Sequence, residues 1–130
     1  MPRVIHFEIQ ADNPERAVTF YEKIFGWTFN KWAGPMDYWL ITTGPDSQPG
    51  INGGLMKRMA AQNMDSMNAY VCTIDVSNLD ESVKQVLSAG GSMAMPKQAV
   101  PGVGWLAYCK DTENNIFGMM QSDPHAKLPA

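Results

Sequence analysis

The sequence predicts an α+β domain made of two tandem βαβββ modules, whose strands join into one curled sheet around a central cavity. Runs of alternating apolar and polar residues, typical of strands, are interrupted once in each half by a helical pattern. The second half also repeats the first: an offset of 65 relates Asn13, Glu15, Val18 and Gly26 to Asn78, Asp80, Val83 and Gly91. One module leaves a sheet face uncovered by its only helix. Two modules are therefore expected to combine and enclose something between their sheets.

The chain is expected to be one domain over residues 1–130, with internal repeats at 3–56 and 69–121 and a connector at 57–68. Its 130 residues suffice for one compact core. Hydrophobic residues make up 45% of the chain and charged residues 18%, which indicates a folded globular protein rather than a disordered one.

Charge and hydropathy narrow the classes of partner. The net charge is -3 and the ten Lys and Arg residues are scattered, so no basic surface is expected to hold nucleic acid. The chain has no run of about 18 apolar residues and no signal-peptide pattern, so we expect a cytoplasmic protein without a membrane partner. Cys72 and Cys109 lie far apart and belong to no Cys-x-x-Cys motif, which favours two buried free thiols.

The first strand is expected at residues 4–10. Its apolar residues share one face, which is expected to enter the core: Ile5, Phe7 and Ile9. The opposite face carries His6, Glu8 and Gln10. An imidazole and a carboxylate two residues apart could bind a metal or move a proton.

A helix is expected to follow. Asp12 can accept a hydrogen bond from the amide of Glu15 while the Glu15 side chain reaches back, and Pro14 suits the first turn. Gly26 is expected to end the helix. The apolar positions of this helix recur at helical spacing: Ala17, Val18, Tyr21, Ile24 and Phe25.

The remaining elements complete the two modules. Strands are expected at 27–32, 38–43 and 51–56, and then at 70–76, 92–95, 104–109 and 116–121. A second capping box at 77–80 opens a second helix, and Gly90 and Gly91 end it. Its apolar face is expected to contain Leu79, Val83, Val86 and Leu87. Residues 122–130 are expected to form a surface extension.

Two stretches resemble a known superfamily. Residues 3–27, from Arg3 to the segment Phe20 to Trp27, are similar to the opening strand and helix of bacterial glyoxalase I, and residues 105–118 resemble its closing strands. The chain is thereby identified as resembling the vicinal oxygen chelate superfamily. This superfamily includes glyoxalase I, extradiol dioxygenases, methylmalonyl-CoA epimerase and the bleomycin and fosfomycin resistance proteins. The resemblance implies the paired βαβββ fold and a homodimer.

The resemblance also implies where a metal would bind. Metal-dependent members take ligands from the first and last strand of each half, and His6 matches the first such position. The other three positions fall near Gly53, Val71 and Gly118, which offer no ligand. A divalent metal normally needs at least three protein ligands, so we expect no tightly bound metal and no other cofactor.

His6 and Glu8 are the candidate catalytic residues. His6 is either a ligand-binding or acid–base residue, a metal ligand, or a hydrogen-bonded cavity histidine without catalytic work. Glu8 is either a second ligand or a general base whose pKa is raised by burial, or a solvated strand residue near the cavity mouth. Asn52 either donates to a substrate carbonyl or shapes a turn. Gly53 and Gly118 either leave room for a ligand or mark a bulge.

Aromatic and thioether side chains are expected to wall the cavity. Strand alternation divides the aromatic candidates, which include Trp32, between core and cavity, so about half should touch a ligand. The candidate ligand-binding residues are Tyr38, Trp39, Asn52, Gly53, Trp105, Tyr108, Gly118 and Met120. Three connector methionines are candidates for a subunit interface: Met59, Met64 and Met67.

The function expected from the sequence is binding or transformation of a small hydrophobic or aromatic molecule without the usual tightly bound metal. The alternative is a divalent-metal-dependent lyase, isomerase or dioxygenase with relocated ligands that include His6 and Glu8. A third reading is a pure interaction module, whose cavity is filled by its own side chains.

Overall fold

The computed structural model describes residues 2–58 and 69–129 and contains the predicted βαβββ order twice. The first module consists of β1 (Val4–Ala11), α1 (Pro14–Phe25), β2 (Thr28–Lys31), β3 (Tyr38–Thr42) and β4 (Gly53–Lys57). The second consists of β5 (Tyr70–Asp75), α2 (Leu79–Ser88), β6 (Ser92–Val100), β7 (Gly104–Lys110) and β8 (Ile116–Ser122). The predicted roles of Met59, Met64 and Met67 lie outside the described residues.

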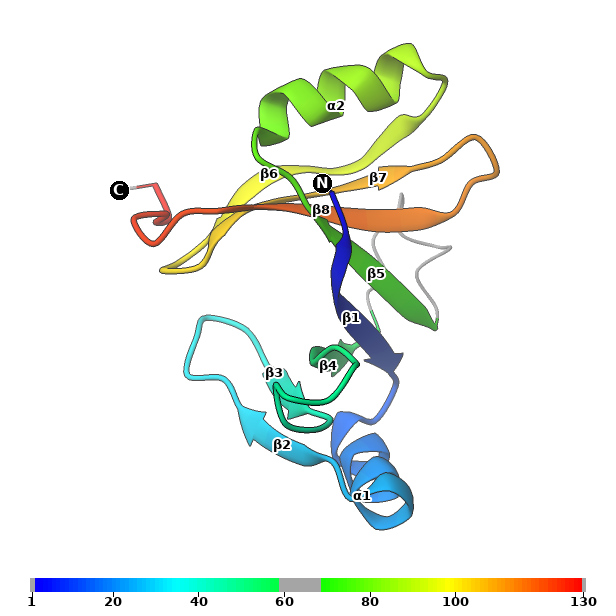
Figure 1. Cartoon of the computed structure of the whole chain (residues 1–130), viewed down its shortest axis with the longest axis vertical. Helices are drawn as coiled ribbons and strands as arrows, with labels where there is room; N and C mark the ends of the chain where they lie inside the picture. The colour runs from blue at the N-terminus through cyan, green and yellow to red at the C-terminus, as the bar shows by residue number, and fades with distance from the viewer. Residues whose placement is uncertain (1, 59–68, 130) are drawn as a thin grey trace.

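The eight strands form one sheet in the order β2-β3-β4-β1-β5-β8-β7-β6. At its centre β1 and β5 pair antiparallel and join the modules, while β4 and β8 pair parallel to them on either side. Figure 1 shows β1 and β5 running between the two halves, with α1 and α2 at opposite ends of the molecule. The α+β fold class and the curled sheet are confirmed.

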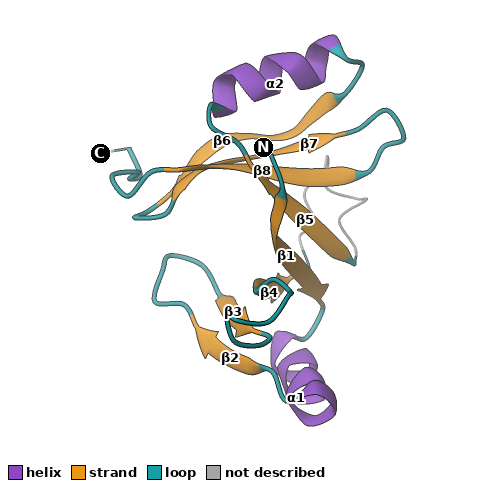
Figure 2. Cartoon of the chain, viewed as in Figure 1, coloured by secondary structure: helices purple, strands orange, loops and turns teal. Residues whose placement is uncertain are grey.

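The register of the strands defines two faces of the sheet. Phe7 lies beside Gly53 and Glu8 beside Gly54, so alternate residues of neighbouring strands share a face. The helix face packs under both helices, which Figure 2 shows on the strand layer. The buried residues of this face are Ile9, Ala11, Ile41 and Leu55 near α1, and Val76, Ala107, Cys109 and Met119 near α2. The opposite, inner face carries Glu8, Val71 and Thr73 from the two central strands.

The helix ends follow local sequence, but the cap of each helix lies one residue later than predicted. Asn13, not Asp12, caps α1, because its Oδ1 accepts a hydrogen bond from the Arg16 amide at 3.1 Å. Asp12 instead forms an ion pair of 2.5 Å with Arg58. Gly26 ends α1 in the left-handed conformation with φ 69°, as predicted. The predicted capping box at 77–80 is likewise displaced by one residue: Asn78, not Ser77, caps α2, and its Oδ1 accepts a hydrogen bond from the Glu81 amide at 3.0 Å.

Several residues expected in the core are exposed. Ile5 is 46% exposed, because a bulge between Val4 and His6 breaks the strict alternation of β1. Two residues at the end of α1 are also open, Ile24 at 54% and Phe25 at 59%, and no residue of α1 is buried. The prediction of two buried thiols is wrong for one cysteine: both are free, but Cys72 is exposed and only Cys109 is buried.

The C-terminal segment is fixed against the fold rather than extended from it. The Gly102 amide donates to the Ala126 carbonyl at 3.0 Å, and the Asp123 amide donates to the Val103 carbonyl at 2.9 Å. Ala126 is only 3% exposed. Within the described ranges, no helix is long and apolar enough to cross a membrane.

Candidate functional site

A buried carboxylate lies at the centre of the inner face. Glu8 is 6% exposed, and its two oxygens accept hydrogen bonds from two tyrosines. The Tyr38 hydroxyl donates to Oε2 at 2.9 Å, and the Tyr108 hydroxyl donates to Oε1 at 2.5 Å. Tyr38 comes from β3 of the first module and Tyr108 from β7 of the second. The Glu8 carboxylate therefore links the two modules through hydrogen bonds.

His6 extends this arrangement, and the four residues His6, Glu8, Tyr38 and Tyr108 form what we call the Glu8 cluster. The His6 Nε2 atom lies 2.7 Å from the Tyr38 hydroxyl oxygen. Because the Tyr38 proton is directed at Glu8, Nε2 must carry the imidazole proton and donate it. The Nδ1 atom then has a lone pair available to a donor.

Burial and charge hold the cluster in defined protonation states. Burial lowers the pKa of the His6 imidazole below its ordinary 6.5, and the nearby Glu8 charge opposes this shift. His6 is therefore neutral at physiological pH. Burial, the Glu8 charge and the hydrogen bond to Glu8 all raise the pKa values of Tyr38 and Tyr108 far above 10.0. Both phenols thus remain protonated donors.

Glycines make room for the tyrosine side chains. A Cβ atom on Gly54 would overlap the hydroxyl and ring of Tyr38. On Gly118 it would lie 2.9 Å from Thr73 Oγ1 and 3.3 Å from the Tyr108 ring. Gly118 is therefore on the inner face, as predicted, but the space beside it is filled by this chain's own residues.

The predicted role of Gly53 requires correction by one position. A Cβ atom on Gly53 would lie 2.5 Å from the Phe7 carbonyl oxygen and 2.8 Å from the Phe7 ring. Gly53 consequently faces the helix side, and Gly54 is the inner-face glycine of β4. The sequence shows two adjacent glycines, Gly53 and Gly54, but not which of them lies beside Glu8. The pairing register of β1 and β4 shows that it is Gly54.

Two of the predicted ligand-binding tryptophans lie on the wrong face for the inner site. Trp39 packs with the core under α1, and Trp105 packs with the core under α2. Each has a lysine over its ring, Lys31 at 5.3 Å and Lys97 at 5.0 Å from the ring centroid. Trp32 instead contacts Tyr38 edge-on, with 6.2 Å between ring centroids.

The other two candidates differ in location. Met120 is partly buried on the inner face, beside Leu106 of β7. Asn52 is exposed outside the cluster, and its Oδ1 accepts a hydrogen bond from the Thr43 amide at 3.0 Å. It shapes the connection between β3 and β4, which is the alternative that the sequence left open.

Gln10 is an inner-face residue that the sequence placed but assigned no role. Its side chain is 4% exposed. Neither amide atom has a hydrogen-bond partner among the described residues. A buried unpaired amide is costly, so Gln10 is a polar group that a bound molecule or a water could satisfy.

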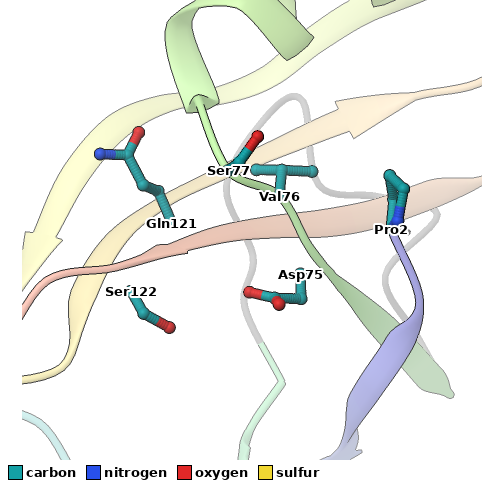
Figure 3. A pocket seen from close by; sticks show the side chains of 6 residues that line it. All are labelled: Pro2, Asp75, Val76, Ser77, Gln121 and Ser122. Carbon is teal, nitrogen blue, oxygen red and sulfur yellow. The ribbon is translucent and has the colours of Figure 1, made fainter.

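A separate polar hollow of about 330 Å³ lies at the start of α2. Figure 3 shows Ser77 and Gln121 directed towards α2, while Asp75 and Ser122 point to the other side of β8. Gln121 Oε1 already accepts a hydrogen bond from the Leu79 amide at 2.8 Å. Among the described residues that line this hollow, Asp75 is the one carboxylate. It has no pair of tyrosine donors like those of the Glu8 cluster in the lining.

The single sheet of paired βαβββ modules, with polar residues of β1 on its inner face, defines the glyoxalase/bleomycin resistance protein/dioxygenase class of fold. Residues 3–44 match the family model described as bleomycin resistance protein-like N-terminal. None of the curated proteins matches the chain. The resemblance to the vicinal oxygen chelate superfamily is confirmed by this partial match and by the fold.

Solved structures share this fold at low sequence identity. Methylmalonyl-CoA epimerase from Mycobacterium tuberculosis is 15% identical with a TM-score of 0.67, covering 93% of this chain and 88% of that one. Hypothetical protein BH1468 from Bacillus halodurans C-125 is 12% identical with a TM-score of 0.65, covering 97% and 98%. A superfamily member from Vibrio splendidus 12B01 is 12% identical with a TM-score of 0.64, covering 94% and 100%.

The residues present do not fit the metal site that the superfamily implies. Residues 2–58 and 69–129 contain no group of three or more His, Cys, Asp and Glu side chains that could hold a metal ion. His6 Nε2 and both Glu8 oxygens are already engaged by tyrosines. Gly54 of β4, which pairs with Glu8, and Gly118 of β8, which pairs with Thr73 of β5, offer no donor side chain.

Proposed function

We propose that the protein binds a small hydrophobic or aromatic molecule on the inner face of its sheet, at the Glu8 cluster, without a tightly bound metal. The observation that carries this proposal is the buried Glu8 carboxylate, which two tyrosines from different modules hold in an apolar setting. A few fixed polar groups among aromatic and aliphatic side chains are typical of small-molecule sites.

The neighbouring side chains support an apolar or aromatic ligand. Trp32 contacts Tyr38 of the cluster with its aromatic ring, and Leu40, on the same face of β3 as Tyr38, is 45% exposed. Met120 and Leu106 continue the apolar surface on the second module. In this proposal the ligand contacts these side chains and donates a hydrogen bond to His6 Nδ1.

A second candidate function rests on the same histidine. Its neutral imidazole has a fixed Nε2–H and an Nδ1 atom without a hydrogen-bond partner among the described residues, which is the state required of a general base. In that case His6 would accept a proton from the bound molecule, and Tyr38 and Glu8 would stabilise the imidazolium. An isomerase or lyase reaction of this kind would exchange a substrate C–H proton with deuterium from solvent, and His6→Gln would abolish the exchange.

Binding can be tested with dansylamide, a neutral aromatic probe whose emission reports an apolar environment. We expect saturable binding that weakens about tenfold in Trp32→Phe and Tyr38→Leu variants, since each removes ring contacts. Trp39→Phe is the matched control, because this tryptophan lies on the helix face. No saturable binding, or equal losses for Trp32→Phe and Trp39→Phe, would reject the inner-face site.

The metal-free part of the proposal has its own measurement. Elemental analysis of protein purified without chelator should find far less than one transition-metal ion per chain. Stoichiometric Ni, Zn, Fe or Mn would instead favour the alternative of a metal-dependent enzyme with relocated ligands.

We further propose that two copies of the chain meet through an apolar patch beside α1. This outer patch consists of Phe20, Ile24, Phe25 and Tyr70, each at least 54% exposed. Its members are connected through Tyr21, which contacts Phe20 at 5.2 Å between ring centroids and bonds the Tyr70 hydroxyl at 2.8 Å. An open aromatic patch of this kind is typical of an interaction surface.

The charges of α1 favour a second copy as the occupant. Glu15 and Arg16 lie near its start, and Glu22 and Lys23 lie near its end. An antiparallel copy related by a two-fold axis would bring each balanced pair against the other and oppose the two helix dipoles. Because these four charges cancel, α1 has no net charge that would favour a strongly acidic or basic partner.

A further inference from the structure

We propose that a groove under the C-terminal segment is a second binding site, for a small aromatic molecule that carries one negative charge. The groove has a volume of about 480 Å³, within the range of small-molecule sites. It is lined by residues of β6, by Trp105 of β7 and by the C-terminal segment: Lys97, Gln98, Ala99, Trp105, His125, Lys127, Leu128 and Pro129.

The groove is separate from the Glu8 cluster. Trp105 packs with the core under α2, on the helix face, whereas Glu8 lies on the inner face. Figure 1 shows the C-terminal segment beyond the ends of β6, β7 and β8, away from β1. The sequence predicted that Trp105 binds a ligand in the central cavity. In this proposal Trp105 binds a ligand in the groove on the helix face instead.

The walls of the groove are held by hydrogen bonds. The Trp105 Nε1–H group donates to Asp123 Oδ2 at 3.0 Å, which fixes the plane of the indole ring. Asp123 Oδ1 accepts from the His125 amide at 2.9 Å, and the Ala126 carbonyl accepts from the Gly102 amide. Because these hydrogen bonds already order the wall, less conformational entropy of the protein is lost when a ligand binds.

The side chains of the groove separate into an apolar surface and a basic rim. Trp105, Ala99, Leu128 and Pro129 supply the surface for an aromatic body, and Leu128 is 52% exposed. The rim contains Lys97, His125 and Lys127, and within the part of the chain that the structure describes no aspartate or glutamate lines the groove.

The two acidic side chains near the groove, Asp80 and Asp123, each have an ion-pair or hydrogen-bond partner. Asp80 forms an ion pair of 3.3 Å with Lys97, and Asp123 accepts the hydrogen bonds from Trp105 and His125. The bond from Trp105 is the main cause that keeps the pKa of Asp123 below its ordinary 3.8. Among the described residues no acidic side chain lines the groove beside Lys127, and Lys97 lies over the Trp105 ring, where its ammonium group would meet a ligand that approaches the indole.

The test is a ¹H–¹⁵N NMR titration of the full chain with 2-naphthoate, followed at the Trp105 indole Nε1–H resonance. The Trp105→Phe spectrum assigns this resonance among those of the four tryptophans. We expect it to shift saturably with 2-naphthoate. The uncharged 2-naphthamide, which has nearly the same shape, should bind roughly fivefold or more weakly. Raising the salt concentration should weaken only the naphthoate.

Charge variants give the matched comparison. Lys127→Gln and Lys97→Gln should each weaken naphthoate binding by about threefold to fivefold, whereas Lys23→Gln on the distant α1 should not. Equal affinity for naphthoate and naphthamide, equal effects of all three variants, or no shift at Trp105 would overturn the proposal. Shifts confined to Tyr38 and Tyr108 would overturn the groove while supporting the inner-face site.

Discussion

Glu8 and Tyr108 are 100 positions apart in the sequence, yet they share a buried hydrogen bond of 2.5 Å. The bond joins the first strand of one module to the seventh strand of the sheet, which belongs to the other module. Tyr38 completes the arrangement from the first module, at 2.9 Å from the second carboxylate oxygen. The same two hydroxyls therefore stabilise the fold and shape the proposed binding surface.

Removing the Tyr108 hydroxyl should destabilise the protein. In Tyr108→Phe the Glu8 Oε1 atom loses its partner while it stays buried, which costs about 1–3 kcal/mol. Urea unfolding followed by circular dichroism measures this loss. Tyr70→Phe is the control, because its hydroxyl bonds Tyr21 at the surface and should cost less than about 1 kcal/mol. Equal effects of the two variants would show that Glu8 does not depend on Tyr108.

Adding a methyl group at Gly54 should displace Tyr38. In Gly54→Ala the new Cβ atom overlaps the phenol, so we expect a loss of about 1–3 kcal/mol in the free energy of unfolding. Combining it with Tyr38→Leu should cost less than the sum of the two single variants, because the overlap disappears. Gly44→Ala, whose Cβ atom would make only an ordinary contact of 3.4 Å with Gln48, is the control. Additive losses would contradict the close approach of Tyr38 to Gly54.

The stability of the protein should fall as the pH drops through the titration of His6. The folded-state pKa of His6 is lowered, so below pH 6.5 the unfolded chain binds a proton that the folded chain resists. The stability that the neutral His6 contributes is present above pH 6.5 and is lost as the pH falls towards the folded-state pKa of His6.

Urea unfolding between about pH 5.5 and 7.5 measures this dependence. His6→Gln should flatten the curve, because the variant lacks the group that titrates. A wild-type curve already flat over this window would contradict a buried neutral His6.

A charge in the outer patch should separate the proposed dimer. Phe25→Glu places a carboxylate on a residue that is 59% exposed, where burial against a second copy would desolvate it. Sedimentation velocity should show a dimer for the wild type and a monomer for the variant. Leu87→Glu, a similarly exposed position on α2, should remain dimeric. A monomeric wild type would remove the proposal.

Local patterns accounted for the architecture. The alternation of β1 places Glu8 opposite Phe7 and Ile9, and Asn13 and Asn78 recur because both cap a helix. These features depend on neighbours within a few residues, so a single sequence contains them. The internal offset of 65 then led to the paired βαβββ order.

The details of the site depend on long-range pairing. Trp39 lies opposite Leu55 and Trp105 opposite Gln121, so the register of β4 and β8 decides that both tryptophans face the helices. A shift of one residue in the pairing of β1 and β4 would place Gly53, instead of Gly54, on the inner face beside Glu8. The bulge that exposes Ile5 and the contact of Tyr108 with Glu8 likewise arise only when distant strands meet.

The most direct test of the central claim is dansylamide binding before and after exhaustive treatment with a chelator. Because the ligand is proposed to contact the Glu8 cluster and its apolar surroundings without a metal, the Kd should be the same in both samples. A loss of tenfold or more on chelation, restored by added Zn²⁺ or Mn²⁺, would contradict the account.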